Sequence, residues 1–305
     1  MHTLAIDMGG SRIKMGLVAD GAVQESAIFP VDSAAPLTQT LLEIERWATM
    51  LTERSSLQPT HVGLAFPGVV HERKIVSCNG KYTDAVNFDW QAWAWERFGK
   101  PIDIINDAAA ALLGEMHFGT AKGADNAVLL MIGTGIGAAA AVNGHLLEGK
   151  HFTLGMLGGH IAIEMAHPRT CSCGNIGCLE AWASTWAINE LAHESPLFDR
   201  SCLRRMAYVD YRAIAQGVEQ NDPLSLRLFD GAASALGMGA VNLVHAYDPE
   251  VVILGGGPTH IPSLCEKIAA YVRQYAWTPW GKVDIRTTEN PDTSVLLGLY
   301  ARSLM

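Results

Sequence analysis

Apolar residues along the 305-residue chain occur either in short runs or at helical spacing. Short apolar runs that end at glycine or at a carboxylate predict buried strands. They cover 4–7, 13–18, 61–66, 101–105, 127–132, 138–142, 251–254 and, at a sheet edge, 283–286. Helical spacing predicts helices at 37–54, 90–98, 108–118, 181–193, 211–217, 223–246, 261–275 and 295–304.

One supersecondary pattern occurs twice in the chain. A strand, a glycine turn and a second strand span 4–18, and the same order returns at 128–142. Asp20-Gly21 and Asn143-Gly144, which follow these strands, are typical hairpin turns. Because helices alternate with the remaining strands, we expect two related α/β halves, each opening on a hairpin.

Composition narrows the class of protein. Hydrophobic residues make up 49% of the chain and charged residues 17%, which is enough for a sizeable core. The formal net charge of -9 and the lack of any Lys/Arg run argue against binding to nucleic acid or to an anionic membrane. Neither a signal peptide nor an apolar run of roughly 18 residues is present, so we expect a cytoplasmic protein.

Two glycine turns are candidate phosphate-binding loops. They read D-M-G-G-S-R-I-K at 7–14 and G-T-G-I-G at 133–137. Glycines let backbone amides approach phosphate oxygens, and Asp7 could hold a hydrated magnesium ion. Each turn alone is equally consistent with an ordinary hairpin, and the turn at 133–137 matches neither the dinucleotide nor the Walker pattern. Two such turns in mirrored halves favour a nucleotide clamped between domains.

The segment N-D-A-A-A-A-L-L-G-E at 106–115 places Asp107 where a strand ends and a helix begins. Such an Asp can simply cap the helix. It can also be the base that takes a hydroxyl proton during phosphoryl transfer, with Asn106 orienting a sugar. The turn Gly255-Gly256-Gly257 allows two interpretations as well, a surface for a nucleoside or a plain strand-helix connection.

Three cysteines lie within eight residues, at Cys171, Cys173 and Cys178, and His160 precedes them. In a reducing compartment disulfides are not expected. Thiolates and imidazole suit tetrahedral zinc, whereas buried inert thiols are the alternative. Because protein groups would fill all four positions, the sequence favours a structural zinc over a catalytic one.

Together these motifs resemble the ROK family (repressors, open reading frames and kinases) of bacterial sugar kinases, from Leu4 to the last helix. The most specific part is the His160 and cysteine pattern ending in Leu179-Glu180, combined with Asn106-Asp107. The resemblance implies an actin-like ATPase (ribonuclease H-like) fold, with two α/β domains around a central cleft. The smaller domain would span 1–106 plus 291–305, and the larger, with the zinc-containing sugar loop, 107–290.

The resemblance also implies ATP-dependent phosphorylation of a hexose or hexose derivative on its primary 6-hydroxyl. Asp107 would be the general base, and magnesium would bridge the phosphates. ATP would bind at Asp7, Gly9, Gly10, Ser11, Lys14, Gly133, Thr134, Gly135, Gly137 and, near adenosine, Gly256. The sugar would contact Gly68, Asn87, Asn106, Asp107, His160 and Glu180.

Two departures from the family pattern fall on the sugar side. Leu157 stands where the family often has a glutamate that binds sugar hydroxyls, and Ala109 where it often has asparagine. The acceptor therefore stays open among glucose, N-acylhexosamines such as ManNAc and GlcNAc, allose and fructose. Family members are commonly dimers or tetramers, and we expect a homodimer.

Two regulatory alternatives remain. The family includes sugar-responsive transcriptional regulators with an N-terminal helix-turn-helix, but the first phosphate strand begins here at Leu4 and the net charge is -9. A catalytically silent sugar-sensing regulator is favoured only by Leu157. Asp107 and both glycine turns favour a kinase.

Overall fold

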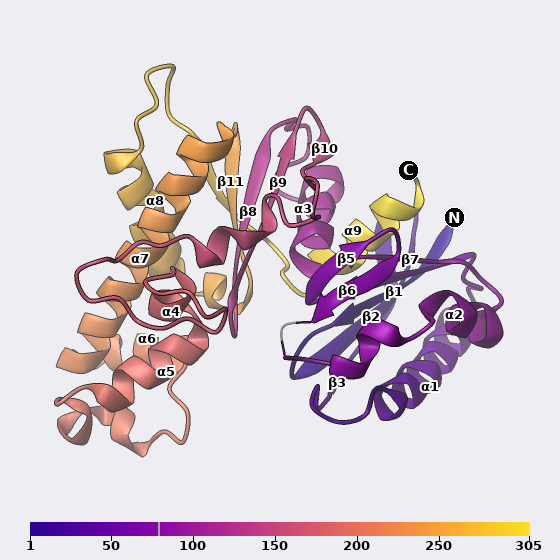
Figure 1. Ribbon diagram of the computed structural model, residues 1–305, viewed down its shortest axis with the longest axis horizontal. Helices are drawn as coiled ribbons and strands as arrows, with labels where there is room; N and C mark the ends of the chain where they lie inside the picture. Colours follow the sequence, from indigo (N-terminus) through magenta and orange to yellow (C-terminus); the bar gives the residue numbers. More distant parts are fainter. Residues whose placement is uncertain (79) are drawn as a thin grey trace. The chain divides into compact units, whose positions relative to one another are not determined.

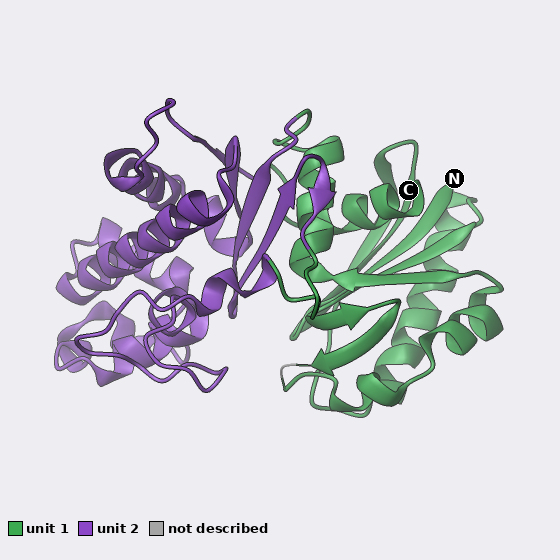
Figure 2. Cartoon of the chain, turned by 45° about the horizontal axis from the view of Figure 1, so that its top comes forward, with its two compact units in different colours: residues 1–123, 148–154, 289–305 green, residues 124–147, 155–288 purple. Residues whose placement is uncertain are grey.

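A computed structural model describes residues 1–78 and 80–305. The chain forms two compact units (Figure 2). Unit 1 comprises residues 1–123, 148–154 and 289–305, and unit 2 comprises residues 124–147 and 155–288. Each unit contains a five-stranded sheet with helices, which confirms the expectation of two α/β halves.

The sheet of unit 1 has the strand order β3-β2-β1-β4-β7. β1 pairs antiparallel with β2 and parallel with β4. The strands are β1 (His2–Met8), β2 (Arg12–Ala19), β3 (Ala22–Pro30), β4 (His61–Phe66) and β7 (Ile102–Asn106). The small hairpin of β5 (Gly68–His71) and β6 (Lys74–Cys78) leads to the 3-10 helix η1 (Thr83–Asn87). The helices are α1 (Leu37–Ser55), α2 (Trp90–Phe98), α3 (Asp107–Phe118) and α9 (Ser294–Ser303) (Figure 1).

The sheet of unit 2 has the strand order β10-β9-β8-β11-β12. Its strands are β8 (Ala127–Ile132), β9 (Ile136–Val142), β10 (His145–Leu146), β11 (Val251–Gly255) and β12 (Asp284–Thr287). Its α-helices are α4 (Glu180–Ala183), α5 (Thr185–Glu194), α6 (Tyr211–Glu219), α7 (Pro223–Tyr247) and α8 (Pro262–Tyr275). Four 3-10 helices are described: η2 (Met156–His160), η3 (Phe198–Arg200), η4 (Cys202–Arg205) and η5 (Gly257–His260).

The two sheets repeat one topology. In each, the first strand is central, the next two follow it antiparallel on one side, and the last two lie parallel on the other. Asp20 and Gly21 have φ of 52° and 73°, and Asn143 and Gly144 have φ of 52° and 77°. Positive φ at both central residues is the hairpin geometry that these residues predict.

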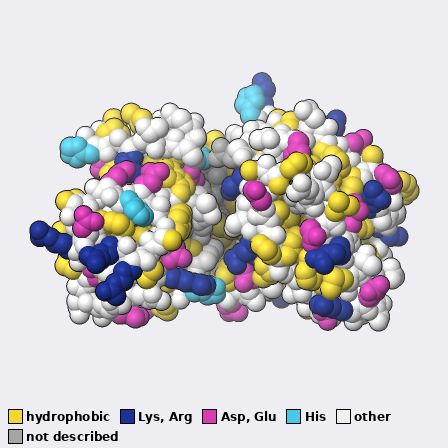
Figure 3. Space-filling model, turned by 90° about the horizontal axis from the view of Figure 1, so that it is seen from below, with side chains coloured by type: hydrophobic (Ala, Val, Ile, Leu, Met, Phe, Trp, Pro, Cys, Tyr) yellow, Lys and Arg dark blue, Asp and Glu magenta, His cyan; other side chains and the backbone are white. Residues whose placement is uncertain are grey.

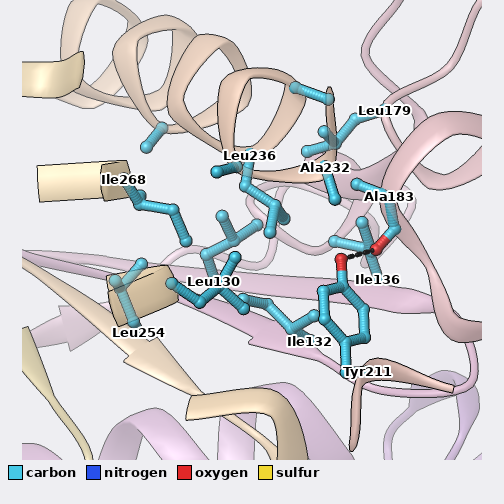
Figure 4. Packing of buried hydrophobic residues seen from close by; sticks show 14 of the residues in the cluster. Leu130, Ile132, Ile136, Leu179, Ala183, Tyr211, Ala232, Leu236, Leu254 and Ile268 are labelled. Carbon is cyan, nitrogen blue, oxygen red and sulfur yellow. Dashed lines mark hydrogen bonds between the residues drawn. The ribbon is translucent and has the colours of Figure 1, made fainter. Parts of the chain in front are cut away.

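Each unit has its own apolar core. In unit 1 one buried cluster joins side chains of the sheet, among them Leu4, Ile6 and Leu64, to side chains of α1 and α2. In unit 2, Leu130 and Leu254 from the sheet pack with Leu236 and Ile268 from the helices (Figure 4). On the face drawn in Figure 3, acidic and basic side chains are interspersed. The described residues include no helix long and apolar enough to cross a membrane.

Two expectations need correction, and some strands were not expected. The helix expected at 181–193 is interrupted at Ser184, which is extended and whose side chain accepts a hydrogen bond from Ala187 N. Strand β3 and the β5–β6 hairpin were not expected. Finally, the boundary expected after residue 106 does not hold, because helix α3 belongs to unit 1. That helix packs backbone to backbone on α9, since a Cβ at Gly298 would lie 2.6 Å from Ala110 C.

Candidate active site

The first glycine turn links β1 to β2, and a side chain at Gly9 or Gly10 would not fit its conformation. A Cβ at Gly9 would lie 2.5 Å from Arg12 O, and one at Gly10 would lie 2.8 Å from Lys81 Cε. The Tyr82 hydroxyl donates a hydrogen bond to Gly9 O at 2.7 Å. The turn is therefore held in one conformation while Ser11 stays exposed.

Asp7 is a buried residue near the end of β1, beside this turn. Burial raises the pKa of Asp7 to about 6, and the Asp107 carboxylate adds to the rise while Lys14 opposes it. Lys14 Nζ lies 3.8 Å from Asp7 Oδ2 and 3.0 Å from Asp292 Oδ1, and it donates to Pro291 O at 3.2 Å. A buried carboxylate that is only partly neutralised fits a magnesium ion held through water.

Asn106 caps helix α3. Its Oδ1 accepts hydrogen bonds from Ala108 N at 3.0 Å and Ala109 N at 3.2 Å, and its Nδ2 donates to Gly68 O at 3.2 Å. A Cβ at Gly68 would collide with the carbonyl oxygen of Ser77. Asn106 thus fixes both the start of the helix and the loop at Gly68, and the capping role considered for Asp107 falls to its neighbour.

Asp107 is the first residue of α3 and is partly buried. Its Oδ1 accepts a hydrogen bond from Ala108 N at 2.8 Å. Burial raises the pKa of Asp107, while the Ala108 amide and the Lys81 ammonium oppose that rise. A carboxyl group with a raised pKa is a better proton acceptor than an ordinary Asp, which suits general-base chemistry.

Asn87 and Ala109 lie apart from this hydrogen-bond network. Asn87 ends η1 and is exposed, and within the described chain no hydrogen bond joins it to Asn106 or Asp107. Ala109 has a partly buried side chain and contributes its backbone amide to the Asn106 cap. The structure therefore brings together most of the site residues predicted in unit 1, but no described hydrogen bond joins Asn87 to them.

The second glycine turn links β8 to β9. Gly133 N donates to Gly135 O at 2.9 Å and closes the turn. The first amides of helix α5 also bind it: Thr185 N donates to Gly133 O at 3.0 Å and Trp186 N to Thr134 O at 3.3 Å. The interruption at Ser184 exposes these amides and so allows the helix to hold the turn.

Gly256 follows β11 and lies beside the same turn. It has φ of 94°, and a Cβ there would lie 2.8 Å from Ile132 C. Ile132 is the last residue of β8, directly before Gly133. The predicted adenosine residue and the predicted phosphate turn are therefore neighbours within unit 2.

Glu180 is buried, with 6% of its surface exposed. Its Oε2 accepts a hydrogen bond from Ile136 N at 2.9 Å. Its Oε1 accepts from Ser172 Oγ at 2.6 Å and from Trp186 Nε1 at 3.3 Å. The side chain expected to contact the sugar thus also joins the second glycine turn to the cysteine loop.

The four predicted metal ligands form one cluster. The ligand atoms of His160, Cys171, Cys173 and Cys178 all lie within 4.8 Å of one another. Cys171 Sγ is 3.5 Å from His160 Nδ1, and the sulfurs of Cys173 and Cys178 are 3.8 Å apart. Zinc–sulfur bonds of about 2.3 Å in a tetrahedron place two sulfurs about 3.8 Å apart, so the donor set and its spacing fit zinc.

Leu157, shortly before His160, is the other position at which the sequence departs from the ROK pattern. Leu157 lies in η2 with 47% of its surface exposed. The glycines that follow it pack on β9, because a Cβ at Gly158 would lie 2.6 Å from Ala138 Cβ and one at Gly159 would lie 2.9 Å from Ile136 C. An exposed apolar side chain thus precedes a ligand of the metal cluster by three residues.

Lys81 and Tyr82 were missed by the sequence interpretation. They contact the turn at Gly9 and Gly10 from far along the chain. A short segment without helical or strand periodicity gives no local signal for such contacts. Ser172 was missed too, although it lies between two predicted metal ligands.

Comparison with known proteins agrees with this arrangement. The sequence matches the ROK family over residues 3–302. It is 29% identical over 291 residues to a glucokinase from Thermotoga maritima, covering 89% of this chain and 88% of that protein. It is 32% identical over 260 residues to the xylose repressor of Bacillus subtilis, covering 83% of this chain but 63% of the repressor.

A ROK hexokinase from Thermus thermophilus has a similar structure, with a TM-score of 0.75 and 26% identity over 98% of this chain and 96% of that one. This similarity confirms the expected actin-like ATPase fold. The family match covers nearly the whole chain, including both glycine turns and the cysteine cluster. The chain belongs to the ROK family.

Proposed function

We propose that this protein transfers the terminal phosphate of ATP to the primary 6-hydroxyl of a hexose or hexose derivative, with Asp107 as the general base. One observation carries the proposal: Asp107 begins a helix that Asn106 caps, its carboxylate interacts electrostatically with Asp7, and burial raises its pKa. The glucokinase and hexokinase relatives support the reaction class.

In the reaction, the sugar hydroxyl oxygen attacks the γ-phosphorus and forms a new P–O bond. The bond between that phosphorus and the bridging oxygen breaks, and ADP leaves with the electron pair. Asp107 accepts the hydroxyl proton, and Asn106 orients the sugar. Because only the ionised carboxylate accepts a proton, activity should rise as the pH passes the raised pKa of Asp107.

The glycine turns would hold the nucleotide. Backbone amides at Gly9, Gly10 and Ser11 in unit 1, and at 133–137 in unit 2, suit phosphate oxygens, and Gly256 would lie near adenosine. Asp7 would hold magnesium through water, and magnesium would neutralise charge on the β- and γ-phosphates. Lys14 would act mainly by holding Asp7 and the segment at Asp292.

We assign structural zinc to His160, Cys171, Cys173 and Cys178. Burial, with a contribution from the Cys171 thiol, raises the pKa of Cys178 to about 12. A bound cation would therefore be needed to keep Cys178 as a thiolate. His160 would also line the sugar together with Gly68, Asn87 and Glu180.

The acceptor is glucose, an N-acylhexosamine, allose or fructose. Leu157 cannot accept a hydrogen bond, so a sugar hydroxyl bound by glutamate elsewhere in the family would be bound here by another group. We further propose that the protein is a cytoplasmic homodimer that does not bind nucleic acid. The net charge of -9 supports the last point.

A sugar-responsive regulator is the second candidate, because the Bacillus subtilis xylose repressor is 32% identical. The Asp107 environment favours catalysis instead. A DNA-binding assay with excess nonspecific competitor separates the two: specific binding that a sugar modulates would favour the regulator, as would measurable sugar binding without ADP formation.

Asp107→Asn tests the proposal. With the preferred sugar from a panel, kcat should fall by about 10²–10⁴-fold, the usual contribution of a general base, while ATP affinity changes little. ADP release in a coupled assay gives the rate, and calorimetry gives ATP binding. Asp20→Asn is the matched control, since Asp20 lies in an exposed turn where asparagine is equally suited. Full activity of Asp107→Asn would overturn the assignment.

A further inference from the structure

Lys81 lies between the β5–β6 hairpin and η1, in a segment that is fixed to the first glycine turn. The next residue, Tyr82, is completely buried. Its hydroxyl donates to Gly9 O at 2.7 Å, and its amide donates to Ser33 O at 2.8 Å. Because both ends of Tyr82 are bonded, the backbone beside Lys81 has a defined position against the turn.

The Lys81 side chain passes over Gly10 at close range. A Cβ built on Gly10 would lie 2.8 Å from Lys81 Cε and 3.1 Å from Nζ. The space beside Gly10 is thus filled by the end of the Lys81 side chain and not by backbone atoms. The ammonium group therefore lies at the turn whose amides are proposed to bind phosphate.

Lys81 has no ion-pair partner in the part of the chain that the structure describes, whereas Lys14 is paired with Asp7 and Asp292. Lys81 is half-buried, so its charge is less screened than that of a surface lysine. Burial raises the pKa of Asp107, and the Lys81 charge acts against that rise, so the two groups interact electrostatically.

We propose that Lys81 is a further catalytic residue, whose ammonium group binds the oxygens of the phosphoryl group during its transfer. This inference rests on the proposed kinase function. As the sugar oxygen bonds to the γ-phosphorus and the bond to ADP breaks, negative charge is spread over the three equatorial oxygens. Lys81 keeps its proton and donates hydrogen bonds to those oxygens, while the hydroxyl proton goes to Asp107.

A purely structural lysine is the competing explanation. In that case Lys81 would cover Gly10 with its aliphatic stem, and its charge would not matter. The two explanations differ in what an apolar side chain of similar length does. Lys81→Met keeps the stem and removes the charge, and Lys81→Arg keeps the charge.

The experiment compares Lys81→Met, Lys81→Arg and the control Lys74→Met, an exposed lysine of β6 in the adjacent hairpin. Lys81→Met should lower kcat by about 10²–10³-fold, the effect of removing one preorganised donor to a developing charge. The KM for ATP should rise by less than about tenfold. Lys81→Arg should recover part of kcat, and Lys74→Met should match the parent.

Nucleotide binding separates failure of this inference from failure of the proposed function. Calorimetry with AMP-PNP and with ADP reports the contribution of the γ-phosphate without turnover, and Lys81→Met should remove most of the preference for AMP-PNP. If the parent forms no ADP with any sugar, the kinase proposal fails and this binding difference still tests Lys81. An Lys81→Met variant with kcat within about threefold of the parent, or with an unchanged nucleotide preference, would overturn the role.

Discussion

The contact between helices α3 and α9 gives a sharp test of the packing that positions Asp107. The two helices meet at glycines: a Cβ at Gly298 would lie 2.6 Å from Ala110 C, and one at Gly114 would lie 2.8 Å from Ser294 C. Both obstacles are backbone atoms, which cannot move out of the way as a side chain can. Gly298→Ala should therefore separate the helices rather than be absorbed locally.

The magnitude follows from two opposing effects. Carbon atoms pack at about 3.5 Å or more, so the helices must separate by on the order of 1 Å. Overpacking of this kind costs up to about 3 kcal/mol. Alanine is a better helix former than glycine by about 1 kcal/mol. Gly298→Ala should then lower the free energy of unfolding of unit 1 by about 2 kcal/mol.

Gly231→Ala is the matched control. Gly231 is exposed in helix α7, and a Cβ there would have no neighbour within 4 Å. Only the propensity effect remains, so this variant should gain about 1 kcal/mol. The same chemical substitution is thus expected to act in opposite directions at two helical glycines, with a difference of about 3 kcal/mol between the variants.

Scanning calorimetry is the assay, because two units need not unfold in a single transition. Gly298→Ala should lower a melting temperature by roughly 4–8 °C and Gly231→Ala should raise one by roughly 2–4 °C. Since α3 begins at Asp107, a displacement of about 1 Å should also lower kcat by on the order of 10²-fold. If Gly298→Ala proves as stable as Gly231→Ala, the close approach of α3 and α9 is wrong.

Two further predictions concern unit 2. Burial of Asp222 is outweighed by its hydrogen bonds from Ser225 and Ser201, so its pKa lies below the ordinary value of 3.8. The Asp222 carboxylate therefore stabilises the folded state above that pH, and this stabilisation is lost as the pH falls below it. Asp222→Asn should flatten the acid side of the curve of unfolding free energy against pH, measured by urea unfolding. An unchanged curve would contradict this. Chelation of zinc should lower the melting temperature of unit 2 and weaken ATP binding. Protein purified without chelator should hold about one zinc per chain by elemental analysis. A zinc content below about half an ion per chain would count against the site.

Regular elements were predictable where burial was strong. The central strands of both sheets are nearly continuous apolar runs, and the sequence located them within a few residues. Strand β3 was missed because it is an edge strand with buried residues only at Ala27 and Phe29. The interruption at Ser184 was missed because the apolar pattern continues through it, although its serine cap is a local signal for a new helix.

The candidate site was predictable where its chemistry is contiguous in sequence. Short segments whose residue types indicate a specific chemistry include both glycine turns, Asn106-Asp107 and the cysteine cluster. The sequence could not decide between Asn106 and Asp107 as the helix cap, because both are good caps. The contacts of Lys81 and Tyr82 were not predictable, since Tyr82 bonds a residue 73 positions away in a segment without periodicity.

Glu180 joins the cysteine loop to the second glycine turn. A carboxylate offers about four acceptor positions. Ile136 N, Ser172 Oγ and Trp186 Nε1 donate to Glu180, and the Cys171 thiol donates to Oε1 at 3.9 Å. A Cys171 thiolate bound to a metal would no longer donate, so a sugar hydroxyl could take about one position on a carboxylate whose orientation is already fixed. Ser172 lies between two predicted zinc ligands, so an ordered metal loop keeps Ser172 in reach of Glu180. The same carboxylate holds Ile136 at the end of the second glycine turn. A zinc ion at this cluster would thus stabilise the second glycine turn through Glu180 without direct contact with the turn.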